Sequence, residues 1–499
     1  MLLRNSLWNL GGSALPAVVA LATVPLLISG LGLEGFGIVT LISSVVGYFG
    51  VLDINLSAGS IKYLAQYHAQ SDQPRFDETF WFGCFFYSVL GLGGAAALYF
   101  GAAPLSAYFF TVSSALQAET RLALQIAGLG FFLSQLQNYL LVVPQALQRY
   151  DRSAQSEAFF GVLVNVASAT VAMAGGGVAG VVATRVAVSA LNSVWLVILL
   201  RQLGVALRPH WPRREIRRAL TTFSAYAYLS RLAAMLHVHG DKLIVGALAG
   251  PVALTFYTVP AQLASRILGL SFRLSSVIYP RVSALAATGQ QSQLRVLYLD
   301  TTRLLTYLNL MVLGVIALAG DVFLARWVGA EFVATGYPIL LFITLALLAD
   351  SLTNIASLVN DGLGHPRVTG RFALARGLVG VAMVYAGTVA GGIIGAAVAH
   401  LLASLLMTAL FLLYVHGRTV PISLSDTLRL AWLPSFAIGA AALLILLPLK
   451  LLLPEGVLGT VLLVALALLA LLAAGLAFIV SVDERAALSA AVRKLVPGS

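Results

Sequence analysis

Long apolar runs recur along almost the whole chain, and they constrain its fold more than any other feature. A helix needs about 20 consecutive apolar residues to cross the hydrocarbon core of a bilayer. The 499 residues are 60% hydrophobic and 10% charged, whereas a soluble domain carries about 25% charged residues. The alternating pattern of a membrane barrel is absent from the sequence. The chain is therefore predicted to be an all-α integral membrane protein.

The apolar runs predict about 14 transmembrane helices, with boundaries soft by a few residues. The predicted spans are 7–31, 36–59, 79–102, 119–142, 157–177, 180–200, 221–248, 252–280, 303–326, 337–360, 368–388, 391–415, 429–452 and 457–480. The first run is too long for the apolar core of a signal peptide, so we expect a retained helix. The longest hydrophilic segments, 60–78 and 201–220, are too short to form a domain.

Basic residues fix the predicted orientation. With the N-terminus in the cytoplasm, the inward segments hold most of the 30 lysines and arginines, among them Arg367, Arg371 and Arg376. The outward segments and helix ends hold only Arg121, Arg326 and Lys450. This bias follows the positive-inside rule and predicts that both termini are cytoplasmic. The net charge of +11 then reflects topology and contact with lipid headgroups. No nucleic-acid partner is expected.

A weak internal repeat predicts how the spans are grouped. The stretch 37–62 overlays 256–281, and each is a long span that ends on a cytoplasmic base. Two six-helix lobes with the same orientation are typical of transporters built from parallel repeats. The expected organisation is an N-terminal lobe at 1–200, a basic linker at 201–220 and a C-terminal lobe at 221–415. An additional two-helix hairpin and cytoplasmic tail would follow at 416–499.

Charged residues inside apolar spans are the main candidate site. The basic ones of the seventh and eighth spans are Arg231, Lys242, Arg266 and Arg273. Each charge costs roughly 2.5–3.5 kcal/mol at the centre of a spanning helix, so these groups need compensation. Helical spacing puts Arg231 and Lys242 on one face, and Arg266 and Arg273 on another. Two alternatives stay open: a structural ion-pair network between helices, and a water-filled cavity that receives an anion.

Acidic and imidazole groups in the spans are candidates for charge pairing or ion coupling. Asp241 lies four residues after His237, which makes that histidine its better local partner. Asp350 belongs to a polar stripe with Asn354 and Asp361, and either pairs with a cavity arginine or carries a coupling proton. Interhelical hydrogen bonding is the structural alternative for this stripe. Asp53 lies nearer the cytoplasmic end of its span, where anchoring is equally plausible.

Several short stretches resemble a known family. The first half contains Gly32-Leu33-Glu34-Gly35-Phe36-Gly37-Ile38, Ser43-Ser44-Val45-Val46-Gly47-Tyr48-Phe49, Leu52-Asp53, Ser57 to Ser60, and Lys62-Tyr63-Leu64-Ala65. The second half contains Asp241-Lys242-Leu243-Ile244-Val245-Gly246, Gly250, Tyr257, Trp327-Val328-Gly329, Phe332 and Gly362-Leu363-Gly364-His365-Pro366-Arg367. Together these resemble Wzx-type polysaccharide and O-antigen flippases of the multidrug/oligosaccharidyl-lipid/polysaccharide exporter superfamily, over about residues 1 to 415.

The resemblance implies a transporter of the bacterial inner membrane. Such a protein moves a polyprenyl-pyrophosphate-linked oligosaccharide from the cytoplasmic to the periplasmic leaflet by alternating access, in a central cavity between its two lobes. Arg231, Lys242, Arg266 and Arg273 would bind the anionic head. Glycan polymerase and glycosyltransferases are possible partners. No enzymatic activity, catalytic residue, metal or cofactor is expected.

Other functions differ in the features they require. A cation-coupled small-molecule exporter of the same superfamily would favour an apolar, acidic cavity. A lipid II flippase has fourteen spans, but it also has arginines in first-half cavity helices, where this chain has only Arg185, near the outward end of span six. A membrane glycan polymerase or ligase would need a large outward loop. A non-transporting scaffold in a glycan-synthesis complex stays open.

Overall fold

The computed structural model of the protein describes residues 2–53, 56–205, 210, 212–276, 281–282, 284–285, 288–452, 457–480 and 485. The backbone alone is described for 2–14, 52, 109, 219, 222–234, 236–238, 270–276, 451 and 457–458. All regular structure in the described residues is helical. The predicted all-α class is thus confirmed for this part of the chain. Arg231, His237 and Arg273 have side chains outside the described set.

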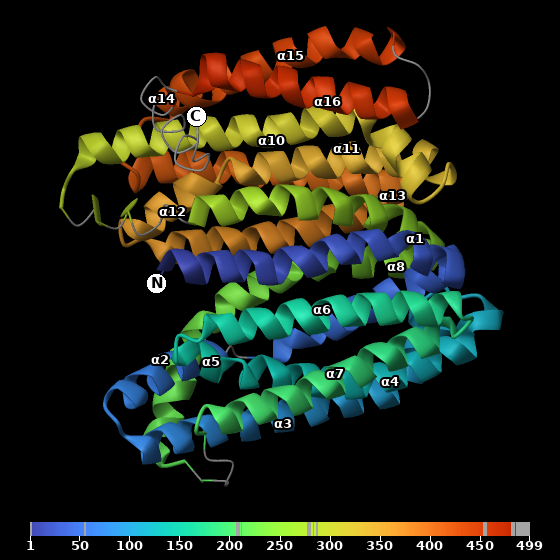
Figure 1. The fold of residues 1–499 in the computed structure, drawn as a ribbon, viewed down its shortest axis with the longest axis vertical. Helices are drawn as coiled ribbons and strands as arrows, with labels where there is room; N and C mark the ends of the chain where they lie inside the picture. Colours follow the sequence, from blue (N-terminus) through green and yellow to red (C-terminus); the bar gives the residue numbers. More distant parts are fainter. Residues whose placement is uncertain are drawn as a thin grey trace, which may run out of the picture. The chain divides into compact units, whose positions relative to one another are not determined.

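The chain divides into two compact units, and the first comprises Met1–Thr258 and Thr388–Ile393. Its helices are α1 (Leu2–Tyr48), η1 (Phe49–Leu52), α2 (Leu56–Ala69), α3 (Gln73–Pro104), η2 (Leu105–Phe109), α4 (Ser114–Leu140), α5 (Val142–Ala146), α6 (Tyr150–Met173), α7 (Gly177–Gln202) and the start of α8 (Arg214–Ser276). Within the unit, α1 packs along α6, α3 packs along α4, and α7 contacts both α4 and α6 (Figure 1).

The second unit comprises Val259–Gly387 and Ile394–Ser499. It contains the end of α8, then α10 (Gln291–Trp327), α11 (Glu331–Ser351), α12 (Asn354–Gly362), most of α13 (Pro366–Arg418), α14 (Leu424–Thr427), η3 (Leu428–Trp432), α15 (Leu433–Leu452), α16 (Val457–Ala474) and η4 (Gly475–Ile479). The long helix α10 packs against α11, α15 and α16, so it forms the centre of this bundle (Figure 1).

Three long helices are broken at glycines. In α1, Gly32 has φ 71° and ψ 171°, and in α8, Gly250 has φ 84° and ψ 172°. Only glycine adopts this region at low cost, because a side chain would clash with the backbone. In α13 the break lies at Gly391 and Gly392. The breaks at Gly32 and Gly250 fall in short segments between two predicted spans, and the break at Gly391 and Gly392 falls at the start of the predicted span 391–415. Each of these helices therefore carries residues of two predicted spans.

Eleven helices among the described residues are long and apolar enough to cross a membrane. Three of them contain the glycine breaks: Leu15–Val51, His239–Gly269 and Pro366–Arg418. A break that reverses the chain would turn one such helix into two crossings. The number of about 14 spans, the orientation of the termini and the arrangement in two six-helix lobes stay predictions.

Each unit has its own buried core. In the first, Tyr87 and Tyr139 are fully buried, and their rings stack with centroids 5.1 Å apart. In the second, Tyr307 is buried between α10 and the C-terminal helices, and its hydroxyl donates to the Leu471 carbonyl at 2.7 Å. Burying such rings keeps their apolar area packed while the hydroxyl finds a partner. These buried tyrosines hold together the helices that carry the candidate site.

Candidate functional site

A hydrogen bond links the two segments of α8 on either side of the bend at Gly250. The Tyr257 hydroxyl donates to Asp241 Oδ2 at 3.2 Å, and Tyr257 is fully buried. The backbone N–H of Lys242 donates to Asp241 Oδ1 at 2.8 Å. The Asp241 carboxylate therefore connects the two sides of the bend, and the Lys242 side chain next to it is partly buried. This contact belongs to the first unit.

Asp53 is held in a buried hydrogen-bonded group. Tyr87 donates its hydroxyl proton to Asp53 Oδ1 at 2.8 Å, and both residues are buried. The Ser57 backbone N–H donates to the Tyr87 hydroxyl at 3.1 Å. Because these contacts join the end of η1, the start of α2 and the middle of α3, Asp53 helps to hold these three helices together.

Asp350 is ion-paired within the second unit. Its Oδ1 atom lies 3.0 Å from a guanidinium nitrogen of Arg376, and the two side chains are 13% and 20% exposed. Arg376 also donates to the Thr408 hydroxyl at 3.3 Å, and Thr408 donates to the Ala349 carbonyl at 3.1 Å. The pair thus links α11 to both halves of α13. The arginine was missed by sequence reasoning, which counted it among the cytoplasmic bases.

Arg266 is different from these paired groups. It lies in the second unit, on α8, and its side chain is exposed. The structure records no hydrogen bond or ion pair between this side chain and the residues that it describes. Arg266 comes three residues after Leu263 and one before Ile267, and both of these line a cavity. A guanidinium group is therefore close, along the helix, to the edge of that cavity.

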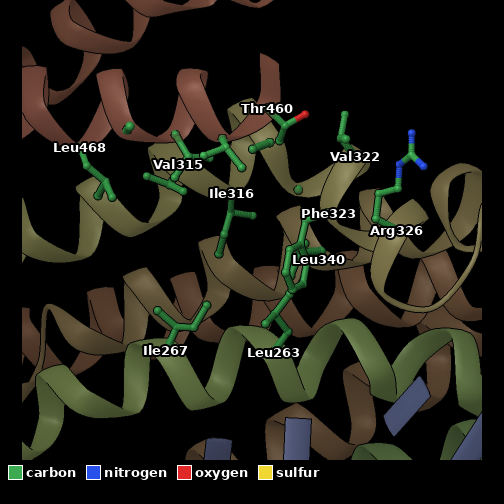
Figure 2. A pocket seen from close by; sticks show the side chains of 15 residues that line it. Leu263, Ile267, Val315, Ile316, Val322, Phe323, Arg326, Leu340, Thr460 and Leu468 are labelled. Carbon is green, nitrogen blue, oxygen red and sulfur yellow. The ribbon is translucent and has the colours of Figure 1, made fainter. Parts of the chain in front are cut away.

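The cavity, which we name the apolar groove, has a volume of about 570 Å³ and lies within the second unit. Four helices line it: α8, α10, α11 and α16. The lining residues are Leu263, Ile267, Val315, Ile316, Ala319, Gly320, Val322, Phe323, Arg326, Leu340, Thr460, Val461, Val464, Ala465 and Leu468. Figure 2 shows Leu468 and Ile267 toward one end and Arg326 toward the other. Arg326 and Thr460 are its polar side chains.

The size and lining of the apolar groove limit what it can bind. Ligand pockets commonly measure about 300–1,000 Å³ and bury most of an apolar ligand. A groove with almost no polar lining favours a hydrocarbon chain over a polar solute, because polar groups lose their hydrogen bonds to water there. The groove is therefore chemically suited to an acyl or prenyl chain.

Of the eight predicted site residues, the structure describes five side chains. Lys242, Asp241 and Asp53 lie in the first unit, and Arg266 and Asp350 lie in the second. Asp241 and Lys242 are neighbours in the chain, and the Lys242 backbone N–H donates to the Asp241 carboxylate. Asp53 and Asp350 each have a local partner on a neighbouring helix.

Comparisons with known proteins give a consistent family and fold. A family model described as "Polysaccharide biosynthesis protein" matches residues 31–337. A "Putative O-antigen transporter" from Shigella flexneri is 23% identical over 431 residues, which cover 84% of this chain and 98% of that protein.

Two solved structures are similar in fold. The lipid II flippase MurJ, in an inward closed conformation, has a TM-score of 0.72 at 11% identity and covers 95% of this chain and 98% of its own. An inward-facing multidrug resistance MATE family transporter of the MOP superfamily has a TM-score of 0.69 at 16% identity, over 82% of this chain and 98% of its own. At these identities the likeness shows that this chain shares their fold.

Proposed function

Since this chain belongs to the polysaccharide biosynthesis protein family, we propose that it is a flippase for a lipid-linked oligosaccharide. The cargo is a polyprenyl-pyrophosphate-linked oligosaccharide, carried from the cytoplasmic to the periplasmic leaflet of the bacterial inner membrane by alternating access. The similarity to a putative O-antigen transporter over most of both chains supports this cargo class. The fold shared with membrane transporters supports the mode of action.

One observation carries the proposal: an apolar groove lies beside an arginine without a recorded partner. A polyprenyl pyrophosphate combines a long hydrocarbon tail with a strongly anionic head. The groove, lined by Leu263 and Ile267 on α8, suits the tail. Arg266 belongs to the same turn of that helix and has donors available for the head, because no partner among the described residues occupies them. One helix thus presents both kinds of group.

The basic groups are assigned to the pyrophosphate. Arg231, Lys242, Arg266 and Arg273 bind the anionic head through charge-assisted hydrogen bonds, which are stronger than neutral ones. Guanidinium groups suit phosphate oxygens because they can donate two parallel hydrogen bonds. The acids Asp241, Asp350 and Asp53, with His237, pair charges or couple ions. The ion pair with Arg376 supports charge pairing for Asp350, while Asp241 and Asp53 accept hydrogen bonds from the neutral hydroxyls of Tyr257 and Tyr87.

The glycine breaks support the proposed topology. If Gly32, Gly250 and Gly392 each mark an outward turn, the three broken helices supply six crossings and both termini are cytoplasmic. Two six-helix lobes around a central cavity, followed by two further helices, then account for the chain. Alternating access would move one lobe against the other.

The proposal is tested by polysaccharide export in cells that lack the chromosomal gene. Wild-type protein should restore surface polysaccharide, and Arg266→Ala should lose most of this activity, while Arg266→Lys keeps part of it because the charge remains. Arg121→Ala is the matched control, since Arg121 is also exposed and has no recorded partner among the described residues. Normal export by Arg266→Ala at normal protein level would contradict the assignment of Arg266. Failure of the wild type to restore export would contradict the function.

A further inference from the structure

A second cavity lies within the first unit, and its lining is polar, unlike that of the apolar groove. Its volume is about 470 Å³, and α4, α5, α6 and α7 line it. We name it the polar pocket, because amide, hydroxyl and charged side chains converge there from four helices. Among the polar residues that line it are Asn138, Gln145, Ser153, Glu157, Arg185 and Asn192.

Part of the wall is already hydrogen-bonded. Ser156 donates its hydroxyl proton to Asn192 Oδ1 at 2.8 Å. Gln137 donates through Nε2 to the hydroxyls of Ser189 and Ser193, at 2.8 and 2.9 Å. These contacts join α6 to α7 and α4 to α7. They connect the helices that form the walls of the pocket.

Several groups in the pocket have no such partner. The Ser153 hydroxyl is buried and makes no hydrogen bond with the residues that the structure describes. For the side chains of Asn138, Gln145 and Glu157, the structure records no hydrogen bond or ion pair with the residues that it describes. Within a bilayer, an unsatisfied polar group costs several kcal/mol. The Ser153 hydroxyl is buried, Gln145 is partly buried, and Asn138 and Glu157 are exposed. These four groups around one cavity therefore indicate a space that holds water or a polar ligand.

The charges in the pocket discriminate between ligands. Glu157 contributes one carboxylate and Arg185 one guanidinium, which donates to the Ser43 hydroxyl at 3.1 Å. The two formal charges cancel, and the other polar groups are neutral amides and hydroxyls. A highly charged anion such as pyrophosphate would favour a site with an excess of positive charge. A neutral ligand with many hydroxyl groups matches this set of donors and acceptors better.

An aromatic ring in the pocket is also typical of a sugar-binding site. Phe160 lines the pocket, and its ring is fixed against Trp195 in an edge-to-face contact with centroids 6.1 Å apart. The C–H faces of a pyranose ring are apolar, so an aromatic side chain can cover them while hydroxyls bond to amides and carboxylates. The volume falls within the range of about 300–1,000 Å³ that is usual for ligand pockets.

We propose that the polar pocket binds the saccharide part of the cargo. The inference rests on the proposed function and deepens it: the pyrophosphate is bound by the basic residues, and the sugar residues are bound by Asn138, Gln145, Ser153, Glu157 and Asn192. Glycan recognition is then a property of the first unit, and it is independent of recognition of the lipid.

Two probes separate these roles in the full-length protein reconstituted in nanodiscs. The first is sugar-free polyprenyl pyrophosphate, and the second is the polyprenyl-pyrophosphate-linked oligosaccharide extracted from the host cells. Wild-type protein should bind the second more tightly. Ser153→Val and Asn138→Leu should each weaken binding of the second probe about fivefold to tenfold, as expected for one lost hydrogen bond. Binding of the sugar-free probe should stay unchanged, which also verifies that the variants fold.

Ser168→Val is the matched control. Ser168 lies on the same helix and does not line the pocket, and its hydroxyl is buried and also lacks a hydrogen bond with any described residue. It should leave binding of both probes unchanged. If Ser153→Val and Asn138→Leu bind both probes as the wild type does, or weaken both equally, the inference is overturned.

The remaining outcomes separate this inference from the function on which it rests. Wild-type protein that binds neither probe would contradict the proposed function together with the saccharide site. Wild-type protein that binds both probes equally tightly would contradict the saccharide site alone. Glu157→Ala should weaken the second probe only. If it stops transport without changing the affinity for that probe, the pocket is a site of ion coupling and the saccharide assignment is wrong.

Discussion

The Asp350 carboxylate lies 3.0 Å from the guanidinium group of Arg376, and this pair connects α11 to α13 in the interior of the second unit. Both side chains are mostly buried, so each neutralises a charge that would otherwise be costly to keep in a membrane-spanning helix. Asp350 has two candidate roles, a structural ion pair and proton coupling. Neutralising both members of the pair distinguishes them, because a structural partner and a coupling acid respond differently to the loss of charge.

Removing one member of this pair should be worse than neutralising both. Arg376→Ala leaves a buried carboxylate without its partner and should destabilise the protein by about 3 kcal/mol. Asp350→Asn combined with Arg376→Gln removes both charges and should recover most of that loss. Thermal unfolding of the purified protein measures both effects. A double variant that is stable but inactive in export would assign a coupling role to Asp350, whereas a stable and active one would assign a structural role.

Gly250 should tolerate a side chain less well than Gly32. Both have a positive φ with an extended ψ, which costs about 1–3 kcal/mol for other residues. At Gly250 an added Cβ would also lie 2.8 Å from the Thr111 hydroxyl, while at Gly32 nothing lies within 4 Å. Gly250→Ala should therefore lower the melting temperature more than Gly32→Ala. Equal losses would mean that the contact with Thr111 adds nothing to the backbone strain.

Filling the apolar groove should impair transport without unfolding the protein. Ala465→Phe on α16 adds a ring inside the groove and should lower the rate of export about tenfold if a lipid tail occupies that space. Ala470→Phe is the matched control, because Ala470 is exposed on the same helix and does not line the groove. Export assays at equal protein level compare them. Equal activity of the two variants would contradict the role of the groove.

Water should reach the polar pocket. Cys84, the one cysteine of the sequence, is buried, so wild-type protein should react slowly with a charged, water-soluble thiol reagent. In a Cys84→Ala background, Glu157→Cys should be labelled quickly. Leu191→Cys, at an exposed apolar position on α7, should be labelled slowly because lipid covers it. Slow labelling of Glu157→Cys, measured by mass spectrometry, would mean that the pocket is closed to water.

Much of the fold follows from the sequence, for a simple physical reason. Hydropathy gave the all-α class, because a bilayer allows few other structures for such runs. The gaps between predicted spans coincide with the breaks at Gly32 and Gly250, whereas the break at Gly391 and Gly392 falls at the start of the predicted span 391–415. The family resemblance is confirmed by the matching family model. Where two spans merge into one helix, the sequence pattern of apolar residues cannot reveal whether the chain reverses.

The candidate site was harder to predict, because pairing depends on which helices meet. Asp350 stood out as an acid in an apolar span, but its partner Arg376 had been grouped with cytoplasmic bases near the end of an apolar run. Asp241 was expected to favour His237, whose side chain lies outside the described residues, so that contact stays a prediction. The recorded partner of Asp241 is Tyr257, across the Gly250 bend.

Glu157 was overlooked for a related reason. It stands at the edge of a predicted span, where a charge is unremarkable. Its importance appears only when α4, α5 and α7 bring their polar groups around it. The sequence did contain one usable signal: Ser153, Glu157 and Phe160 recur at helical spacing and share one face of α6.

The most direct test of the central claim is flipping by purified protein in sealed proteoliposomes. The oligosaccharide-bearing polyprenyl pyrophosphate is placed in both leaflets, and a saccharide-modifying enzyme outside reports the fraction that reaches the outer leaflet. Wild-type protein should bring nearly all of the lipid within reach of the enzyme, while Arg266→Ala and empty liposomes expose only the fraction that was outside at the start. The account is contradicted if wild-type proteoliposomes expose no more lipid than empty ones.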